Sequence, residues 1–129
     1  MTVYPITPVP KPRQTRSDKW KQRPSVMRYR AYADEVRLRQ VQLPPHYHVV
    51  FVLPMPKSWS AAKRAKHTGQ PHRNKPDKDN LEKALLDALL ADDSGVWDGR
   101  VSKVWGDAGR IIVQAIPAPD LEKLLEPDT

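Results

Sequence analysis

The 129-residue chain contains no cysteine, and no apolar run in it approaches the length of a membrane span. Without cysteine there is no disulfide framework and no zinc site built on thiolates. A helix that crosses a bilayer needs roughly 20 apolar residues, and the N-terminus from Met1 to Pro5 lacks the charged and apolar regions of a signal peptide. We therefore expect a cytoplasmic protein with no membrane partner.

Acidic residues are scarce over long parts of the chain. Residues 1–30 hold one acid against eight Lys or Arg, and residues 57–76 hold none against six. The formal net charge is +7 and the sequence pI is about 9.8, a surplus that favours a polyanionic partner such as nucleic acid. Candidate DNA contacts are Arg13, Arg16, Lys19, Lys21 and Arg23, and then Lys57, Lys63, Arg64, Lys66, Arg73 and Lys75.

The aromatic residues leave two interpretations of these basic groups open. Trp20 lies within the first group and can stack on an exposed base. The alternative is that both groups are solvated loops and that Trp20 belongs to the core. Trp59, Trp97 and Trp105 are interpreted as core or interface anchors rather than as ligand platforms.

The length fits one compact domain, so we expect a single domain over residues 1–129, with a basic strand and loop over 1–24 and a tail over 117–129. Strands are predicted over residues 2–9, 46–53, 96–105 and 110–116, and helices over residues 26–39, 58–66, 80–91 and 121–125. The prolines of the first strand place it at a sheet edge, the second strand is predicted to be central, and the last two form a hairpin through residues 106–109. Ser25 is the expected cap of the first helix, whose apolar residues are Met27, Ala31, Val36 and Leu38.

The charge reverses over residues 77–98, which hold seven acids and two lysines. Asp77 and Asp79 follow Pro76, which lets the chain arrive in an extended conformation. Because residues two apart in extended backbone point to the same side, the two carboxylates can converge on one ion. The helix is then expected to begin at about Asn80, with Asp79 as its N-cap and Glu82 at the capping-box position.

The residues that follow can complete this site. Lys83 lies one turn beyond Asp79, where its ammonium can reach a bound phosphate or steady the aspartate. Asp92 and Asp93 come directly after the helix, and Asp93 can supply a third ligand if the next strand returns beside the helix start. Oxygen-only ligands suit Mg²⁺ or Mn²⁺, ions that polarise the phosphoryl oxygen and generate hydroxide in phosphodiester hydrolysis.

Each acid also has a structural interpretation. Asp79 alone is compatible with a helix cap, and Asp92 with Asp93 alone is compatible with an ordinary turn. Asp98, which precedes a glycine, is interpreted as a turn residue, and Asp87 as the intrahelical ion-pair partner of Lys83. The combination favours a metal site, because two aspartates, a helix start, a lysine one turn on and a further acidic pair occur together.

Three segments carry a resemblance to a known family: Lys75-Pro76-Asp77-Lys78-Asp79-Asn80-Leu81-Glu82-Lys83, Asp87-Ala88-Leu89, and Asp92-Asp93-Ser94-Gly95-Val96. They resemble the signature of the RusA family of Holliday junction resolvases, small endonucleases common in phages and prophages. Two departures stand out. The link between Asp87 and Asp92 is shorter than is common in the family, and Gly95 replaces the usual glutamine.

The resemblance implies that Asp77, Asp79 and Asp93 bind Mg²⁺ or Mn²⁺, that Asp92 supports them and that Lys83 takes part in catalysis. If the register onto Asp93 is wrong, Asp98 becomes the third ligand. The implied fold is α/β (α+β), a single small domain in which a mixed sheet of about four strands carries two main helices.

The same resemblance implies a homodimer that nicks symmetric strands of a four-way DNA junction, leaving 5′-phosphate ends, in recombination and repair within a bacterial or phage-infected cell. Two other hypotheses stay open at this point. One is a non-catalytic basic DNA-binding module whose acids are caps and turns, and the other is a related nuclease that acts on flaps and other branched DNA.

Overall fold

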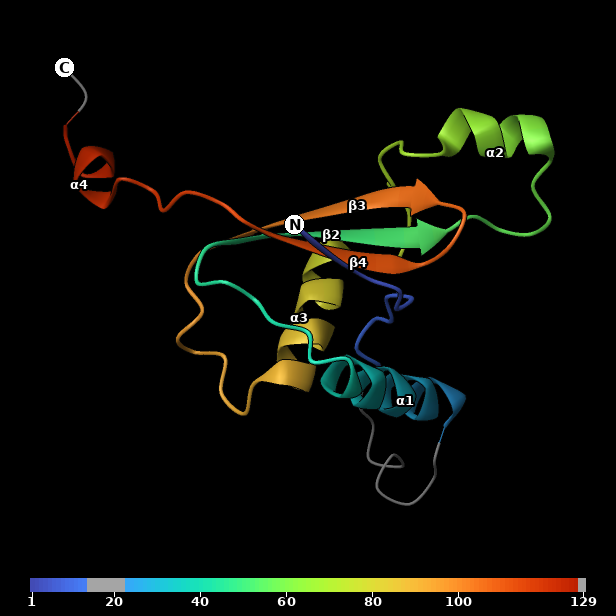
Figure 1. The fold of residues 1–129 in the computed structure, drawn as a ribbon, viewed down its shortest axis with the longest axis horizontal. Coiled ribbons are helices and arrows are strands. Elements are labelled where there is room, and N and C mark those ends of the chain that lie inside the picture. Colours follow the sequence, from blue (N-terminus) through green and yellow to red (C-terminus); the bar gives the residue numbers. More distant parts are fainter. Residues whose placement is uncertain (14–22, 128–129) are drawn as a thin grey trace.

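The computed structural model describes residues 1–13 and 23–127. Within these residues one mixed sheet has the strand order β1-β4-β2-β3 (Figure 1). β2 runs parallel to β3 and antiparallel to β4, and β1 pairs with β4 in antiparallel fashion. The strands are β1 (Thr2–Tyr4), β2 (Tyr47–Pro54), β3 (Gly99–Gly106) and β4 (Arg110–Ala115). The helices are α1 (Pro24–Leu38), α2 (Ala61–His67), α3 (Lys78–Leu89) and α4 (Leu121–Leu124).

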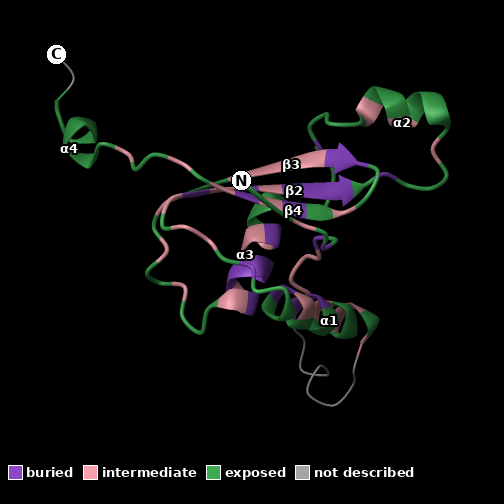
Figure 2. Ribbon diagram, viewed as in Figure 1, coloured by how far each residue is buried: buried purple, intermediate pink, exposed green. Residues whose placement is uncertain are grey.

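The predicted fold class is confirmed, since α1 and α3 both cover one face of the four-stranded sheet (Figure 1). Alternate residues of β2 point to this face, and Phe51 at its centre has no exposed surface. Burying one such side chain contributes roughly 1.5–3 kcal/mol. The opposing residues of α3 recur at helical spacing and are buried (Figure 2): Leu81, Ala84, Leu85 and Ala88. This packing fixes α3, and with it the acidic segment at its start.

The predicted hairpin between the last two strands is wrong. β3 and β4 follow one another in the chain, but they lie on opposite sides of β2. The apolar run of β2 is best buried as a central strand, and it pairs with Trp105 of β3 through Leu53 and with Ile111 of β4 through Phe51. The connection must therefore cross the end of β2. At Gly106 a Cβ would collide with the side chain of Val52, so the crossing needs a glycine.

Helix α1 differs from its predicted form at its start. It begins at Pro24, with Arg23 as N-cap and no side-chain cap hydrogen bond, so Ser25 lies inside the helix. Proline is well suited to the first helical position, because its φ is fixed near the helical value and its missing N–H is not needed there. The predicted Ser25 cap is wrong for this reason.

The buried face of α1 also differs from the predicted stripe. Tyr32, Ala33 and Val36 are buried, whereas Met27 is 46% and Leu38 is 82% exposed. The helix packs against α3, and polar side chains on this face donate hydrogen bonds to carbonyl oxygens of α3. These are Tyr29 Oη to Ala84 O at 2.9 Å and Arg37 Nε to Ala88 O at 2.8 Å.

The remaining elements match their predictions with shifted ends. β1 is an edge strand, as predicted, but it ends at Tyr4. α2 begins at Ala61 rather than at residue 58, because Ser60 accepts a hydrogen bond from Lys63 N and caps it. This helix has no buried residue and stands apart from the body, beyond the C-terminal ends of β2 and β3 (Figures 1 and 2). In the described part of the chain, no helix has the length and apolar character that crossing a membrane requires.

Candidate active site

The segment that leads into the acidic site is attached to the free edge of β3. Gly69 N donates to Trp105 O at 2.9 Å, Trp105 N to Gln70 O at 3.0 Å and His72 N to Lys103 O at 3.0 Å. The backbone of residues 69–72 is therefore held against the sheet. This segment, which lies outside every predicted strand and helix, thus has a fixed course up to His72.

Lys103 fixes the next stretch of this segment. Its Nζ donates to the carbonyl oxygens of Asn74 and Pro76, both at 2.7 Å. These are charge-assisted hydrogen bonds, which are stronger than neutral ones. They hold the backbone directly before Asp77. The peptide bond between Lys75 and Pro76, within this stretch, is cis.

Sequence reasoning missed this role of Lys103, although a signal was present. On one face of β3 the lysine lies between Val101 and Trp105, two apolar residues. A cation on an otherwise apolar strand face indicates a specific partner, because burying an unpaired charge is costly.

Helix α3 begins two residues earlier than predicted. Asp77, not Asp79, occupies the N-cap position, with φ −69° and ψ 147°, and its side chain makes no cap hydrogen bond. Asp79 lies in the first turn, where its Oδ1 accepts from Asn80 N at 2.9 Å. The predicted capping box is also wrong, since Glu82 instead accepts a 2.6 Å hydrogen bond from Tyr47 Oη.

These corrections have a common physical cause in contacts from distant strands. Lys103 holds the extended arrival at Pro76, and a helix that starts at Lys78 lets Glu82 reach Tyr47. Burial and the hydrogen bond to Glu82 raise the pKa of Tyr47, which remains a neutral donor. Negative charge in the first turn also interacts favourably with the helix dipole, so Asp79 is well placed there.

Asp77 and Asp79 line one open hollow of about 710 Å³ at the start of α3. The other lining residues are His72, Arg73, Asn74, Lys75, Lys78 and Lys103. Lys75 Nζ lies 3.2 Å from Asp77 Oδ2, but the two side chains are 87% and 59% exposed, and ion pairs this exposed contribute little. The hollow therefore offers two accessible carboxylates among four cationic side chains.

Lys83, in the middle of α3, contacts one acid further along the helix and one in the loop that follows it. Its Nζ lies 3.2 Å from Asp87 Oδ1 and 3.1 Å from Asp93 Oδ2, so the predicted ion pair with Asp87 is confirmed. The hydrogen bonds that Lys83 donates to Asp93 and Asp87 raise the pKa of Lys83, which stays charged. Burial alone would raise the pKa of Asp87. Hydrogen bonds and attraction from Lys11, whose Nζ lies 3.1 Å from Asp87 Oδ2, and from Lys83 have the larger combined effect, so the pKa of Asp87 is lowered.

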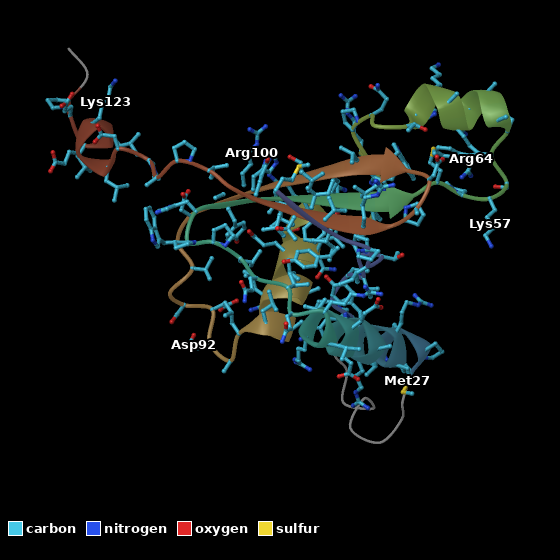
Figure 3. The ribbon with its side chains drawn as sticks, viewed as in Figure 1. Met27, Lys57, Arg64, Asp92, Arg100 and Lys123 are labelled. Atoms are coloured by element: carbon cyan, nitrogen blue, oxygen red, sulfur yellow. The ribbon has the colours of Figure 1, made fainter. Side chains whose placement is uncertain are left out.

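The other acids have local partners. Asp92 lies in the loop after α3 (Figure 3), and its Oδ1 accepts from Ser94 N at 2.9 Å, which lowers the pKa of Asp92. Asp98 Oδ2 lies 2.9 Å from His46 Nδ1, next to the first residues of β2 and β3. The Asp92 contact is local to its loop, whereas the Asp98 contact joins the segments that precede β2 and β3.

The structure brings Asp77 and Asp79 to one hollow and returns Asp93 to Lys83 on the same helix. Across the described residues, no group of three or more His, Cys, Asp or Glu side chains is arranged to hold a metal ion. The three-aspartate ligand set, and Asp98 as its alternative, therefore stay predictions.

The second basic group leads directly to the acidic hollow. Lys57 precedes α2, three members lie on α2, and Arg73 and Lys75 line the hollow itself. Figure 3 shows Lys57 and Arg64 beside α2, beyond the ends of β2 and β3. Arg64 is partly engaged, because it donates to Pro56 O at 3.0 Å.

Only part of the first basic group lies within the described residues. Arg23 donates a hydrogen bond from its guanidinium to Arg13 O. The remaining candidates of this group, together with Trp20, lie outside the described residues: Arg16, Lys19 and Lys21.

A family model described as Endodeoxyribonuclease RusA matches residues 5–115 of the chain. The chain belongs to the RusA family. The resemblance carried by the acidic motif is thus confirmed, and the match spans strands β2, β3 and β4, helices α1 to α3 and the whole candidate site. No curated protein matches the chain well enough to add a second comparison. RusA is a family of endodeoxyribonucleases associated with Holliday junctions, so a nuclease that acts on junction DNA is supported.

Proposed function

We propose that this RusA-family chain is a Mg²⁺- or Mn²⁺-dependent endodeoxyribonuclease that resolves four-way DNA junctions by paired symmetric nicks. The observation that supports it most is the direct connection of a basic segment, residues 57–75, to the exposed pair Asp77 and Asp79. Cations there neutralise the phosphates of DNA and position the strand. Family membership supports DNA as substrate and hydrolysis of a phosphodiester as the reaction.

The donor set fits a hard divalent cation in its chemistry. Asp77 and Asp79 present exposed carboxylate oxygens in one hollow, and such oxygens are the ligands that Mg²⁺ and Mn²⁺ prefer. Asp93 is the proposed third ligand, because its contact with Lys83 returns it to α3. A bound ion would polarise the phosphoryl oxygen and lower the pKa of a bound water.

The other residues of the site position the substrate. Lys103 holds the backbone before Asp77, so the backbone that carries the Asp77 carboxylate has a fixed position. Arg73, Lys75 and Lys78 line the same hollow and would hold phosphates on either side of the scissile bond. The charged ammonium of Lys83 is suited to stabilise negative charge that develops on the phosphate.

Paired nicks require two sites related by symmetry, and each chain contributes the acidic hollow at the start of α3. The proposal therefore includes a homodimer, because a twofold axis would match the symmetry of the junction. Light scattering of the purified protein tests this part. A monomer that nicks both strands of a junction with equal timing would overturn it.

Cleavage of labelled substrates tests the function. Wild type and Asp79→Asn are incubated with four-way junctions, flaps and linear duplex, with Mg²⁺ or Mn²⁺. The proposal expects paired nicks in junctions by wild type, and retained binding with lost cutting in Asp79→Asn. Equal cutting of flaps and junctions would favour the broader branched-DNA nuclease.

One observation favours the non-catalytic alternative, namely that Asp77 and Asp93 both contact lysines. Carboxylates paired in this way are stable without a metal ion. Binding without cutting by both proteins, over a range of Mg²⁺ and Mn²⁺ concentrations, would establish that alternative and remove the proposed reaction.

A further inference from the structure

A second hollow adjoins the acidic one and contains no acidic side chain. Its volume is about 680 Å³, and its lining residues are Trp59, Lys63, Lys66, His67, Gln70, Pro71, Arg73, Asn74 and Trp105. Arg73 and Asn74 line both hollows. A chain of phosphates that follows this surface can therefore pass from one hollow to the other.

The floor of this hollow is an aromatic cluster. The ring of Trp59 lies 4.9 Å from that of Trp105 and 4.8 Å from that of His67, and Trp105 lies 4.0 Å from His72. Trp105 and His72 are buried, whereas Trp59 is half-buried. The buried rings hold Trp59 from one side and leave part of its surface at the hollow.

A flexible cation covers the ring of Trp59. Lys63 Nζ lies 4.4 Å from the ring centroid, and the lysine side chain is exposed. Stacking of a nucleobase on an aromatic ring has an equilibrium constant about tenfold larger than that of an exposed cation–π contact. A base can therefore displace the ammonium, which remains close enough to pair with the phosphate of the same nucleotide.

The lining has the groups that a nucleotide needs. Volumes of roughly 300–1,000 Å³ are usual for sites of small ligands. The amides of Gln70 and Asn74 can donate to or accept from the edge of a base, and Lys66 and Arg73 add positive charge. A base inside a duplex has both faces covered by its neighbours, so only an unpaired or extruded base can use this floor.

We propose that this hollow binds one unpaired nucleotide of the DNA substrate, with its base on Trp59 and its phosphates on Lys63, Lys66 and Arg73. The inference rests on the proposed function in taking DNA as the partner that continues to Asp77. It gives the site a physical basis for preferring branched DNA, because bases next to a branch point unstack more easily than bases in a duplex. It also gives Trp59 a binding role in place of the anchoring role that the sequence suggested.

Photo-crosslinking tests the placement directly in the unmodified protein. Four-way junctions carry 5-iodouracil at the branch point or, as a control, in the middle of an arm, and no divalent metal is added. We expect the branch-point probe to cross-link to Trp59, His67 or Trp105, identified by mass spectrometry. Cross-links that map only to other parts of the chain would overturn the inference.

Binding measurements with matched variants give the second test. Trp59→Ala should weaken binding of the junction about 5- to 150-fold and change binding of linear duplex less than twofold, whereas Trp59→Phe should retain most of the affinity. Trp97→Ala is the control, because Trp97 is 58% exposed and lies outside both hollows. Equal losses on junction and duplex, with the fold intact by circular dichroism, would refute the stacking role.

The outcome is separable from that of the proposed function. If wild type cuts junctions in Mg²⁺ while Trp59→Ala binds and cuts like wild type, the nucleotide site is refuted and the nuclease stands. If wild type cuts no substrate but its branch-point cross-link maps to Trp59, the nuclease is refuted and the nucleotide site stands. The cross-link to wild type decides the inference even where Trp59→Ala fails to fold.

Discussion

Replacing Lys103 by methionine is the sharpest test of how the fold builds the acidic site. Methionine keeps most of the side-chain volume but removes two charge-assisted hydrogen bonds, those to Asn74 O and Pro76 O. A hydrogen bond to a charged group contributes about 1.5–3 kcal/mol. Asn74 is exposed and Pro76 is half-buried, so water can replace part of the loss, and we expect a total near ~2 kcal/mol rather than twice the single-bond value.

This loss of unfolding free energy can be measured as a change in melting temperature. For a domain of this size, 1 kcal/mol shifts Tm by about 4 °C, so Lys103→Met should melt about 8 °C below wild type. The rate of junction cutting at saturating DNA should fall by about 10- to 100-fold, because a small displacement of a reacting group has effects of that size. Binding of the junction should change far less, since other cations make the phosphate contacts.

A crossed control separates position from charge. Burial lowers the pKa of His72 and that of His48, and the charges of Lys103 and Arg100, respectively, lower them further. Arg100 lies on the same strand but points away from α3 (Figure 3). NMR titration should show the pKa of His72 raised in Lys103→Met and that of His48 raised in Arg100→Met. Lys103 does not position the acidic segment if Arg100→Met loses as much stability and cutting as Lys103→Met.

Three further predictions follow from the same contacts. Lys83→Met releases Asp93 and should reduce cutting strongly while changing stability little, because the pair is exposed; a large drop in the urea midpoint would contradict this. Burial lowers the pKa of His72 and of His48, so the neutral rings favour the folded state, and stability should be full above about pH 6.5 and decline as the pH falls below it. His72→Phe should flatten that decline between pH 7 and 5. Urea unfolding at several pH values measures it, and a pH dependence of stability equal to that of wild type would contradict the prediction. The logarithm of DNA affinity should fall steeply with the logarithm of salt concentration, and the slope should decrease by about 3, as measured by anisotropy, when three residues are replaced by alanine: Lys63, Lys66 and Arg73.

The elements that the sequence predicted well are those whose signals are local. β2 reads as a central strand because of its continuous β-branched and aromatic run, and α3 because of its apolar stripe. The acidic motif consists of three short segments within residues 75–96, so its resemblance to the RusA family did not depend on the fold. Each of these features lies within one short stretch of sequence.

What the sequence did not predict depends on contacts between distant segments. The start of α3 moved to Lys78 because Lys103 and Tyr47, on two different strands, hold Pro76 and Glu82. The false hairpin arose because a short turn favours pairing of neighbouring strands, whereas β2 needed partners on both edges. The second hollow, which contains Trp59 and Trp105, is lined by residues from α2, from the segments on either side of it and from β3. No single stretch of sequence therefore reveals it.

The lysines around the acidic segment change what can be concluded from its carboxylates. Residues 77–98 look strongly acidic in sequence, but lysines contact three of their aspartates, and two of those lysines, Lys11 and Lys75, come from outside this segment. A surplus of carboxylates therefore does not by itself demand a divalent ion here, since the fold already supplies counter-charges. The family match supports the nuclease more firmly than the clustering of acids does. Among the acids, the pair at the start of α3 supports a metal best, because its only lysine contact, Lys75 to Asp77, is highly exposed within the described residues and is easily displaced.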